Sequence, residues 1–232
     1  MKTILLKLSG EVLAYDGKSI NTKLIHSIAQ QIKTLQKEIR FGIVIGGGNF
    51  FRGGRQGNHY GISRTSADTV GMLATIMNGV ILQDLFLSEG LASRVLSALP
   101  VPTIVSSISD ANIQETQTHN TCIIFAGGTG NPFFTTDTNA VIRALQLNAD
   151  CLWKATNVDF VYTTDPKTDS SSKPLKKLHY NDVLQQKLQI IDSTAITLAQ
   201  QHKLPVRIFN IFGQDSLLKA AGASDFGSII TN

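Results

Sequence analysis

The sequence predicts an α/β protein with a mostly parallel sheet, and two observations support this fold class. Short apolar runs rich in β-branched residues alternate with longer segments whose apolar residues recur every three or four positions. That alternation is typical of βαβ units, in which helices cover both faces of a parallel sheet. The length of 232 residues fits one large domain, with or without a small appendage.

In the first half of the chain, residues 3–8 form the first expected strand, and a helix follows. The apolar positions of this helix are Ile20, Leu24, Ile28, Ile32 and Leu35. We expect a strand at 41–45, a long core or subunit-contact helix at about 66–86, and buried strands at 101–105 and 121–125. A helix over about 137–147 completes this half, with Thr136 or Asp137 as its N-cap.

The second half continues the same alternation with shorter elements. Short strands are expected at 151–155 and 160–162, followed by a mobile polar loop at 163–177. The remaining expected elements are helices near 181–187, 192–202 and 215–221 and strands at 206–209 and 228–231.

Composition narrows the class of protein. Charged residues make up 16% of the chain, below the roughly 25% typical of soluble domains, which suggests that other subunits cover part of the surface. The net charge of +4 comes from scattered basic residues, which suits anionic small ligands better than a nucleic acid. We therefore expect a homo-oligomer that binds no nucleic acid.

The cysteines and the N-terminus exclude other classes. Cys122 and Cys151 lie in separate apolar stretches, with neither the spacing of a zinc site nor a disulfide framework. Lys7 interrupts the N-terminal apolar run, so no hydrophobic core of a signal peptide is expected. Apolar runs stay short of the roughly 18 residues of a membrane span. We expect no membrane segment and a cytoplasmic location.

Three glycine-rich turns each follow an expected strand, at residues 9–10, 46–48 and 127–130. Ligands of open α/β sheets bind beyond the carboxyl ends of the strands, where glycine allows backbone N–H groups to approach phosphate. Each turn alone could be a simple tight turn. Together they indicate one large site for a polyanion.

Two common nucleotide motifs do not account for these turns. Residues 17–19 resemble the end of a Walker A loop, but Val12 stands where that motif needs glycine. Residues 128–133 begin like the dinucleotide fingerprint and end in Phe133 instead of glycine or alanine. Lys7 ends a buried strand, so its ammonium group must either reach solvent or meet an anion such as a transferring phosphoryl group.

Five segments resemble the bacterial uridylate (UMP) kinases of the amino acid kinase family, and the resemblance spans essentially the whole chain. They are residues 7–10 (KLSG), 46–53 (GGGNFFRG), 72–79 (MLATIMNG), 128–137 (GTGNPFFTTD) and 154–159 (KATNVD). The run from Gly130 to Asp137 is the most specific of them. The resemblance implies a single α/β/α sandwich over residues 1–232 that transfers the γ-phosphoryl group of ATP to UMP, with Mg²⁺ bridging the ATP phosphates.

The resemblance also implies the roles of individual residues. Those expected to act in catalysis are Lys7, Arg52, Asp137 and Asp192. Those expected to bind ATP are Lys7, Ser9, Gly10, Gly48, Arg52, Thr156, Asn157, Tyr162 and Asp165. Those expected to bind UMP are Gly47, Asp68, Thr129, Gly130, Asn131, Pro132, Phe133, Phe134, Thr135 and Thr136. No residue is expected to form a dedicated metal site, and a homohexamer is expected.

Several of these residues also have simpler explanations. Asp68, Asp137 and Asp192 each lie near a helix start, where aspartate commonly caps. Tyr162 could stack on adenine or only pack in the fold. The chain also departs from the family pattern: Gln83 and Thr121 replace arginines at subunit contacts, only Arg94 is retained, and Phe160 replaces a glycine. Activation by GTP is therefore left open.

Two other functions are compatible with the same pocket. A kinase of this fold could phosphorylate a carboxylate or carbamate, although such a substrate would not need Asp68 or residues 130–137. A regulatory protein could bind UMP without turnover, although it would not need the cations Lys7 and Arg52 together with Asp137 and Asp192.

Overall fold

The computed structural model describes residues 1–14, 19–52, 60–164, 168–169, 171–186, 188 and 190–232. Within these residues nine strands form one sheet in the order β4-β3-β5-β2-β1-β6-β10-β11-β9. Its central strands are β1 (Lys2–Leu8), β2 (Ile39–Ile45), β5 (Cys122–Ala126), β6 (Cys151–Thr156) and β10 (Val206–Asn210). Toward the edges lie β3 (Ser93–Ser97), β4 (Ser106–Ser107), β11 (Ser228–Thr231) and β9 (Lys177–His179). Every pair is parallel except β10 with β11, as the sequence predicts.

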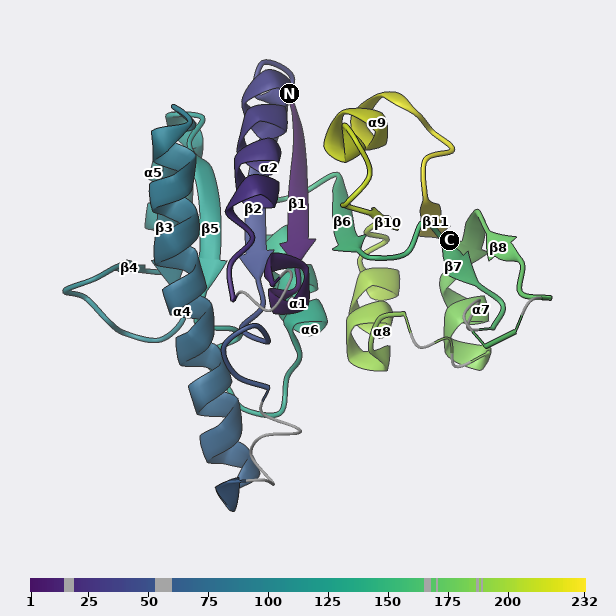
Figure 1. Ribbon diagram of the computed structural model, residues 1–232, viewed down its shortest axis with the longest axis horizontal. Coiled ribbons are helices and arrows are strands. Elements are labelled where there is room, and N and C mark those ends of the chain that lie inside the picture. The colour runs from purple at the N-terminus through teal and green to yellow at the C-terminus, as the bar shows by residue number, and fades with distance from the viewer. Residues whose placement is uncertain (15–18, 53–59, 165–167, 170, 187, 189) are drawn as a thin grey trace.

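Helices cover both faces of the sheet, so the protein is a three-layer α/β/α sandwich. One face carries α1 (Gly10–Leu13), α2 (Thr22–Leu35), α4 (Arg64–Ser88) and α9 (Ser216–Gly222). The other carries α5 (Asp110–Thr118), α6 (Thr136–Gln146), α7 (Tyr180–Gln185) and α8 (Ser193–Gln201). In Figure 1 the arrowheads of β1, β2, β5 and β6 point to the same end of the sheet, where α1 lies.

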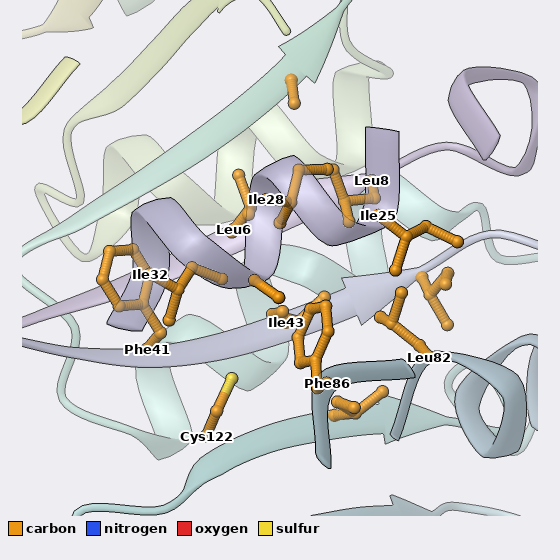
Figure 2. Close-up of a cluster of buried hydrophobic side chains, with 14 of the residues drawn as sticks. Leu6, Leu8, Ile25, Ile28, Ile32, Phe41, Ile43, Leu82, Phe86 and Cys122 are labelled. Carbon is orange, nitrogen blue, oxygen red and sulfur yellow. The ribbon is translucent and has the colours of Figure 1, made fainter. Parts of the chain in front are cut away.

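The alternation of side chains along β1 explains the two cores. Leu6 and Leu8 point into the layer that contains α2 and α4, whereas Leu5 points into the layer that contains α6 and α8, as a strand with a period of two requires. Figure 2 shows the first of these layers, with Ile28 of α2 beside Leu6. Each fully buried aliphatic side chain contributes roughly 1.5–3 kcal/mol, so both faces of the strand stabilise the fold.

The structure corrects one expected strand. Residues 101–105 lie in a turn, and the strand at this side of the sheet is β3 at Ser93–Ser97, between β4 and β5. Pro102 has no N–H to donate to a ladder, whereas Arg94 fits an internal position because its guanidinium pairs with Glu115 at 2.7 Å. An apolar run that contains Pro102 was therefore wrongly predicted as a strand, and a strand with polar ends was missed.

Smaller elements also differ from expectation. Helices α1 and α5 were not predicted, because four residues and a polar helix give little apolar periodicity. The expected strand at 160–162 is the two-residue β7 (Val161–Tyr162), which pairs with β8 (Pro174–Leu175) outside the main sheet. The segment 163–177, expected as a loop, thus supplies a strand to this hairpin.

Helix α4 is the one helix in the described part of the chain that is long and apolar enough to cross a membrane. Its best window has a mean hydropathy of 1.6, and 44% of that window is buried. The helix packs on β2, β3 and β5, as a core helix of a globular protein does. The expected absence of a membrane span stays a prediction.

Candidate functional site

The glycine-rich turns after β1 and β2 pack directly against each other. A Cβ atom added to Gly10 would lie 2.3 Å from the Gly48 backbone nitrogen, and one added to Gly47 would lie 2.6 Å from the Gly71 oxygen. The Gly46 N–H donates to the Leu8 carbonyl at 2.9 Å. These backbones approach so closely that only glycine fits.

The loop between β5 and α6, residues 127–135, joins the same end of the sheet. Gly127, Gly128 and Gly130 have φ values of 75°, 58° and 82°, a region that glycine adopts without strain. The Gly127 N–H donates to the Thr75 hydroxyl of α4 at 2.8 Å. The third turn is thereby fixed to the helix that also contacts Gly47, so all three expected turns meet.

A buried cluster of two lysines and one carboxylate lies where these segments converge. Lys7 of β1 and Lys154 of β6 are register partners, so both side chains leave the sheet on the same face. Asp137, in the first turn of α6, lies above them. Its Oδ1 is 3.0 Å from the Lys7 Nζ, and its Oδ2 is 2.6 Å from the Lys154 Nζ.

Burial and charge act in opposite directions within this cluster. Burial alone would raise the pKa of Asp137, but the two lysines outweigh it and hold that pKa below its usual value. Burial lowers the pKa of Lys154, with the neighbouring Lys7 adding to the effect and Asp137 opposing it. Two ammonium groups and one carboxylate leave the cluster with excess positive charge in a poorly solvated place, and the nearby Asp192 offsets part of that charge. The positive charge that remains favours an anionic ligand.

Asp192 links two helices beside this cluster. Its carboxylate accepts from the Ala195 N–H at 2.9 Å and so caps α8. It also accepts from the Thr138 hydroxyl of α6 at 3.0 Å and from the Thr135 hydroxyl. Asp192 is therefore the N-cap of α8, which is one of the roles that the sequence left open for it. The N-cap of α6 is Thr135, not Thr136 or Asp137 as expected, which leaves the Asp137 carboxylate available for the lysines.

A cleft of about 300 Å³ opens beside Lys7, and we call it the Thr156 cleft. It is lined by Lys7, Ser9, Glu11, Val12, Ala14, Lys154, Ala155, Thr156, Asn157 and Phe212. Five of the residues expected to bind ATP lie here or, like Gly10, in the adjoining turn. Tyr162 does not line this cleft in the described part of the chain; its ring meets the Phe160 ring edge-on at 6.4 Å. Asp165 lies outside the described residues.

A second cleft, of about 280 Å³, lies between α4 and the loop 127–135, and we call it the Asp68 cleft. Seven residues expected to bind UMP line it: Gly47, Asp68, Thr129, Asn131, Phe134, Thr135 and Thr136. Gly130, Pro132 and Phe133 belong to the same loop but not to its lining. Gly48, expected on the ATP side, also lines this cleft.

Asp68 fastens this loop to α4 instead of capping the helix. The cap is Ser63, and the Asp68 carboxylate accepts from the Phe133 N–H at 2.8 Å and pairs with Arg64 at 2.8 Å. The Arg64 guanidinium also lies 5.8 Å from the centre of the Phe133 ring. Asp68 therefore fixes the shape of the cleft wall.

Arg52 connects the two clefts. Its Nε donates to the Gly48 carbonyl at 3.2 Å, and its Nη1 lies 3.2 Å from the Glu11 carboxylate. Gly48 lines the Asp68 cleft and Glu11 lines the Thr156 cleft. A guanidinium at this junction can contact phosphate groups that enter from either side.

A third cavity, of about 570 Å³, adjoins the cluster from the side of α7 and α8. Asp137, Lys154 and Asp192 are the charged residues of its lining. The rest of its wall is mostly apolar, with residues such as Leu184, Leu188 and Ile196.

Sequence reasoning missed three residues at this site. Lys154 was quoted as part of a motif without a role, although its place at the end of a buried strand is the signal that singled out Lys7. Arg64 could have been paired with Asp68 from their spacing of four residues on a helix. Phe212 gave no local signal, because only the fold brings it beside Thr156.

Comparisons with known proteins agree with this geometry. The model of the amino acid kinase family matches residues 2–210. Uridylate kinase of Escherichia coli strain K12 is 40% identical over 232 residues, which cover 99% of this chain and 96% of that protein. The crystal structure of UMP kinase from Ureaplasma parvum superposes with a TM-score of 0.94 at 32% identity, covering 100% of this chain and 99% of the other.

A second solved structure, UMP kinase from Bacillus anthracis, also has a TM-score of 0.94, at 36% identity and with 99% and 96% of the two chains covered. Sequence and structure therefore agree over nearly the full length of both proteins. The chain belongs to the amino acid kinase family.

Proposed function

We propose that this protein phosphorylates UMP to UDP with ATP as the donor, a step of pyrimidine nucleotide synthesis. The observation that carries the proposal is the meeting of two clefts at the cluster of Lys7, Asp137 and Lys154. One cleft holds the donor nucleotide and the other holds the acceptor. Their phosphate groups then meet at the cations, as an in-line transfer requires.

The Thr156 cleft is the donor side. Ser9 and the Gly10 turn provide backbone groups for the ATP phosphates, and Lys7 lines the same cleft. Thr156 and Asn157 lie toward the nucleoside. We keep Tyr162 and Asp165 as proposed ATP-binding residues; Tyr162 would have to approach from the neighbouring hairpin. The exposed ring of Phe212 offers the cleft a flat apolar surface.

The Asp68 cleft is the acceptor side. Asp68, Thr129, Asn131 and Thr136 offer hydrogen-bonding groups for the ribose, the pyrimidine edge and the phosphate. The glycines at 47 and 48 allow the backbone to approach the UMP phosphate. Gly130, Pro132 and Phe133 shape the loop behind this surface.

Positive charge at the junction drives the chemistry. Phosphoryl transfer places charge on the equatorial oxygens of the moving group, and fixed cations stabilise that charge without reorganising. Lys7 and Arg52 contact the group, Lys154 adds to the field, and Asp137 holds both lysines in place.

The residues present fit a Mg²⁺ ion that is carried in with ATP. Among the described residues no group of three or more His, Cys, Asp or Glu could hold a metal by itself, and Mg²⁺ commonly keeps several waters and binds through substrate phosphates. Asp192 would hold it through water, because its oxygens already accept from Thr135, Thr138 and Ala195. When bound, the ion would supply positive charge that offsets the charge of the ATP phosphates.

We also propose that the chain forms a homohexamer in the cytoplasm. The number of subunits rests on the family resemblance. Support for assembly comes from α4, whose exposed face carries a stripe of apolar residues: Val70, Leu73, Met77, Val80 and Leu87. A stripe of this kind on a charge-poor surface is typical of a subunit contact.

An acceptor panel tests the function. With ATP and Mg²⁺, a coupled assay of ADP release should respond to UMP far more than to CMP, aspartate or carbamate. Lys7→Ala should lose most turnover while isothermal titration still detects UMP binding, because Lys7 does not line the Asp68 cleft. Turnover of aspartate or carbamate alone would identify a different kinase. Tight UMP binding with no ATP consumption would identify a regulatory protein.

A further inference from the structure

Arg143 is a buried cation on α6, and among the described residues no carboxylate pairs with it. The residue is 6% exposed. Burial lowers the pKa of Arg143 to about 10, and no acidic group among the described residues opposes it. Burying an uncompensated charge costs free energy, and an apolar side chain of similar volume is often as stable or more stable. Stability therefore gives no reason for arginine at this position.

The guanidinium lies under the loop 127–135. Its Nη2 donates to the Gly128 carbonyl at 3.2 Å, and its Nη1 donates to the Gln146 side chain at 2.7 Å. Its carbon Cζ is 5.9 Å from the centre of the Phe125 ring. The Nε has no hydrogen-bond partner among the described residues. The contact with Gly128 is the one that joins Arg143 to a wall of the Asp68 cleft.

That contact fixes the orientation of one peptide group. The described residues contain no cis peptide bond, and in a trans peptide the carbonyl and the following N–H point in opposite directions. With the Gly128 carbonyl turned toward Arg143, the Thr129 N–H points away from it. Gly128 and Thr129 line the cleft and Arg143 does not. No acceptor for the Thr129 N–H occurs in the described part of the chain.

Because glycines lead into this peptide group, its orientation depends on hydrogen bonds from other residues. Gly127 and Gly128 have positive φ values, and glycine adopts both signs of φ about equally readily. The Thr75 hydroxyl holds the Gly127 N–H at 2.8 Å, and Arg143 holds the carbonyl of the next residue. The two contacts together fix a segment that glycine alone would leave free to rotate.

We infer that Arg143 is a positioning residue for the acceptor nucleotide: by holding the Gly128 carbonyl, it turns the Thr129 N–H into the Asp68 cleft to donate to a nucleotide oxygen. The inference rests on the proposed function, because it assumes that UMP occupies this cleft. The oxygen belongs either to the phosphate or to the uracil ring, both of which accept hydrogen bonds.

Arg143→Met tests the inference, since methionine fills similar space without charge or donor. We expect the KM for UMP to rise about tenfold, a loss typical of one well-placed hydrogen bond, while the KM for ATP stays within about twofold. The Tm should not fall, because a buried charge is removed. Arg143→Lys should recover part of the UMP affinity, because one donor can still reach the carbonyl.

Gln146→Met is the matched control, because it removes the other side-chain partner of Arg143 and leaves Gly128 held; its KM for UMP should equal that of the wild type. Isothermal titration with UMP and with uridine identifies the oxygen. A phosphate contact predicts that Arg143→Met weakens UMP binding only, and a uracil contact predicts that both ligands weaken alike. Either result supports the inference.

Three results would overturn it. One is an unchanged KM for UMP in Arg143→Met with a lower Tm, which would mark a purely structural role. Another is an equal rise of the KM for both nucleotides. The third applies if Arg143→Met does not fold. In that case, an Arg143→Lys variant with wild-type affinity for UMP and a lower Tm would show that Arg143 does not position the loop for UMP. If the wild-type protein does not phosphorylate UMP, the proposed function fails as well, so the two failures are distinct.

Discussion

At the scale of single residues, the candidate site contains two lysines that share one carboxylate. Lys7 and Lys154 leave neighbouring strands at the same register position, so the sheet itself sets their separation. Burial strengthens the attraction of both to Asp137 and prevents water from screening the excess positive charge. The same cluster in solvent would have little effect on an incoming phosphate.

Lys154→Met should therefore reduce kcat by about 100-fold, the size of effect expected when one fixed charge is lost from a phosphoryl-transfer site. The KM for UMP should change little, because Lys154 does not line the Asp68 cleft. Steady-state kinetics with varied UMP and ATP measure both quantities. Lys23→Met, an exposed lysine on α2, is the control. A kcat within threefold of the wild type would show that Lys154 is not needed for transfer.

At the scale of elements, the glycine-rich turns after β1 and β2 allow the carboxyl ends of these two strands to lie close together. Gly10 begins α1, and its Cα faces the backbone of Gly48 and Asn49. Asn78 of α4 holds the same turn, donating to the Gly46 carbonyl and to the Asn49 side chain at 2.7 Å each. The two turns and α4 thus form a single packed unit. The loss of any of these contacts would weaken its packing.

Gly10→Ala should disrupt this unit. The added methyl group would lie 2.3 Å from the Gly48 nitrogen, so the two turns must separate, and we expect both a lower Tm and a KM for ATP raised at least tenfold. Thermal unfolding and kinetics at varied ATP test this. Gly222→Ala is the matched control, because its Cβ would meet no atom within 4 Å and should leave the protein unchanged or slightly more stable. If both variants had the same Tm and the same KM for ATP, the close packing of the two turns would not be needed for stability or for ATP binding.

At the scale of the whole molecule, α4 has two apolar faces. Its inner face packs on the sheet through residues such as Leu82 and Phe86, and its outer face carries the exposed apolar stripe defined above. Its N-terminal half also supplies Asp68 to the site. Assembly through the outer face would therefore stabilise the helix that forms one wall of the Asp68 cleft.

Charge on that outer face should prevent assembly. The double variant Leu73→Glu and Met77→Glu places two carboxylates one helical turn apart on the exposed side, and we expect a smaller species than the wild type by light scattering coupled to gel filtration. Lys23→Glu on α2 is the control for surface charge. A wild-type mass in the double variant, or a monomeric wild type, would reject α4 as the subunit contact.

The sequence alone determined the α/β class, most of the main strands and helices, and the three glycine turns, because these depend on periodicity and on backbone preferences that are local in the chain. Motif resemblance added the candidate residues, and the structure brings Lys7, Arg52, Asp68, Asp137 and the loop 127–135 together at the carboxyl ends of the strands.

Only the tertiary structure decided which of several compatible roles a residue has. Capping was open for Asp68, Asp137 and Asp192, and of these only Asp192 caps a helix. Lys154 gained a partner through strand register, and Arg143 gained a role through a carbonyl fifteen residues earlier in the chain. These assignments depend on contacts between residues distant in sequence, which local patterns do not encode, because burial and pairing arise only when the layers pack.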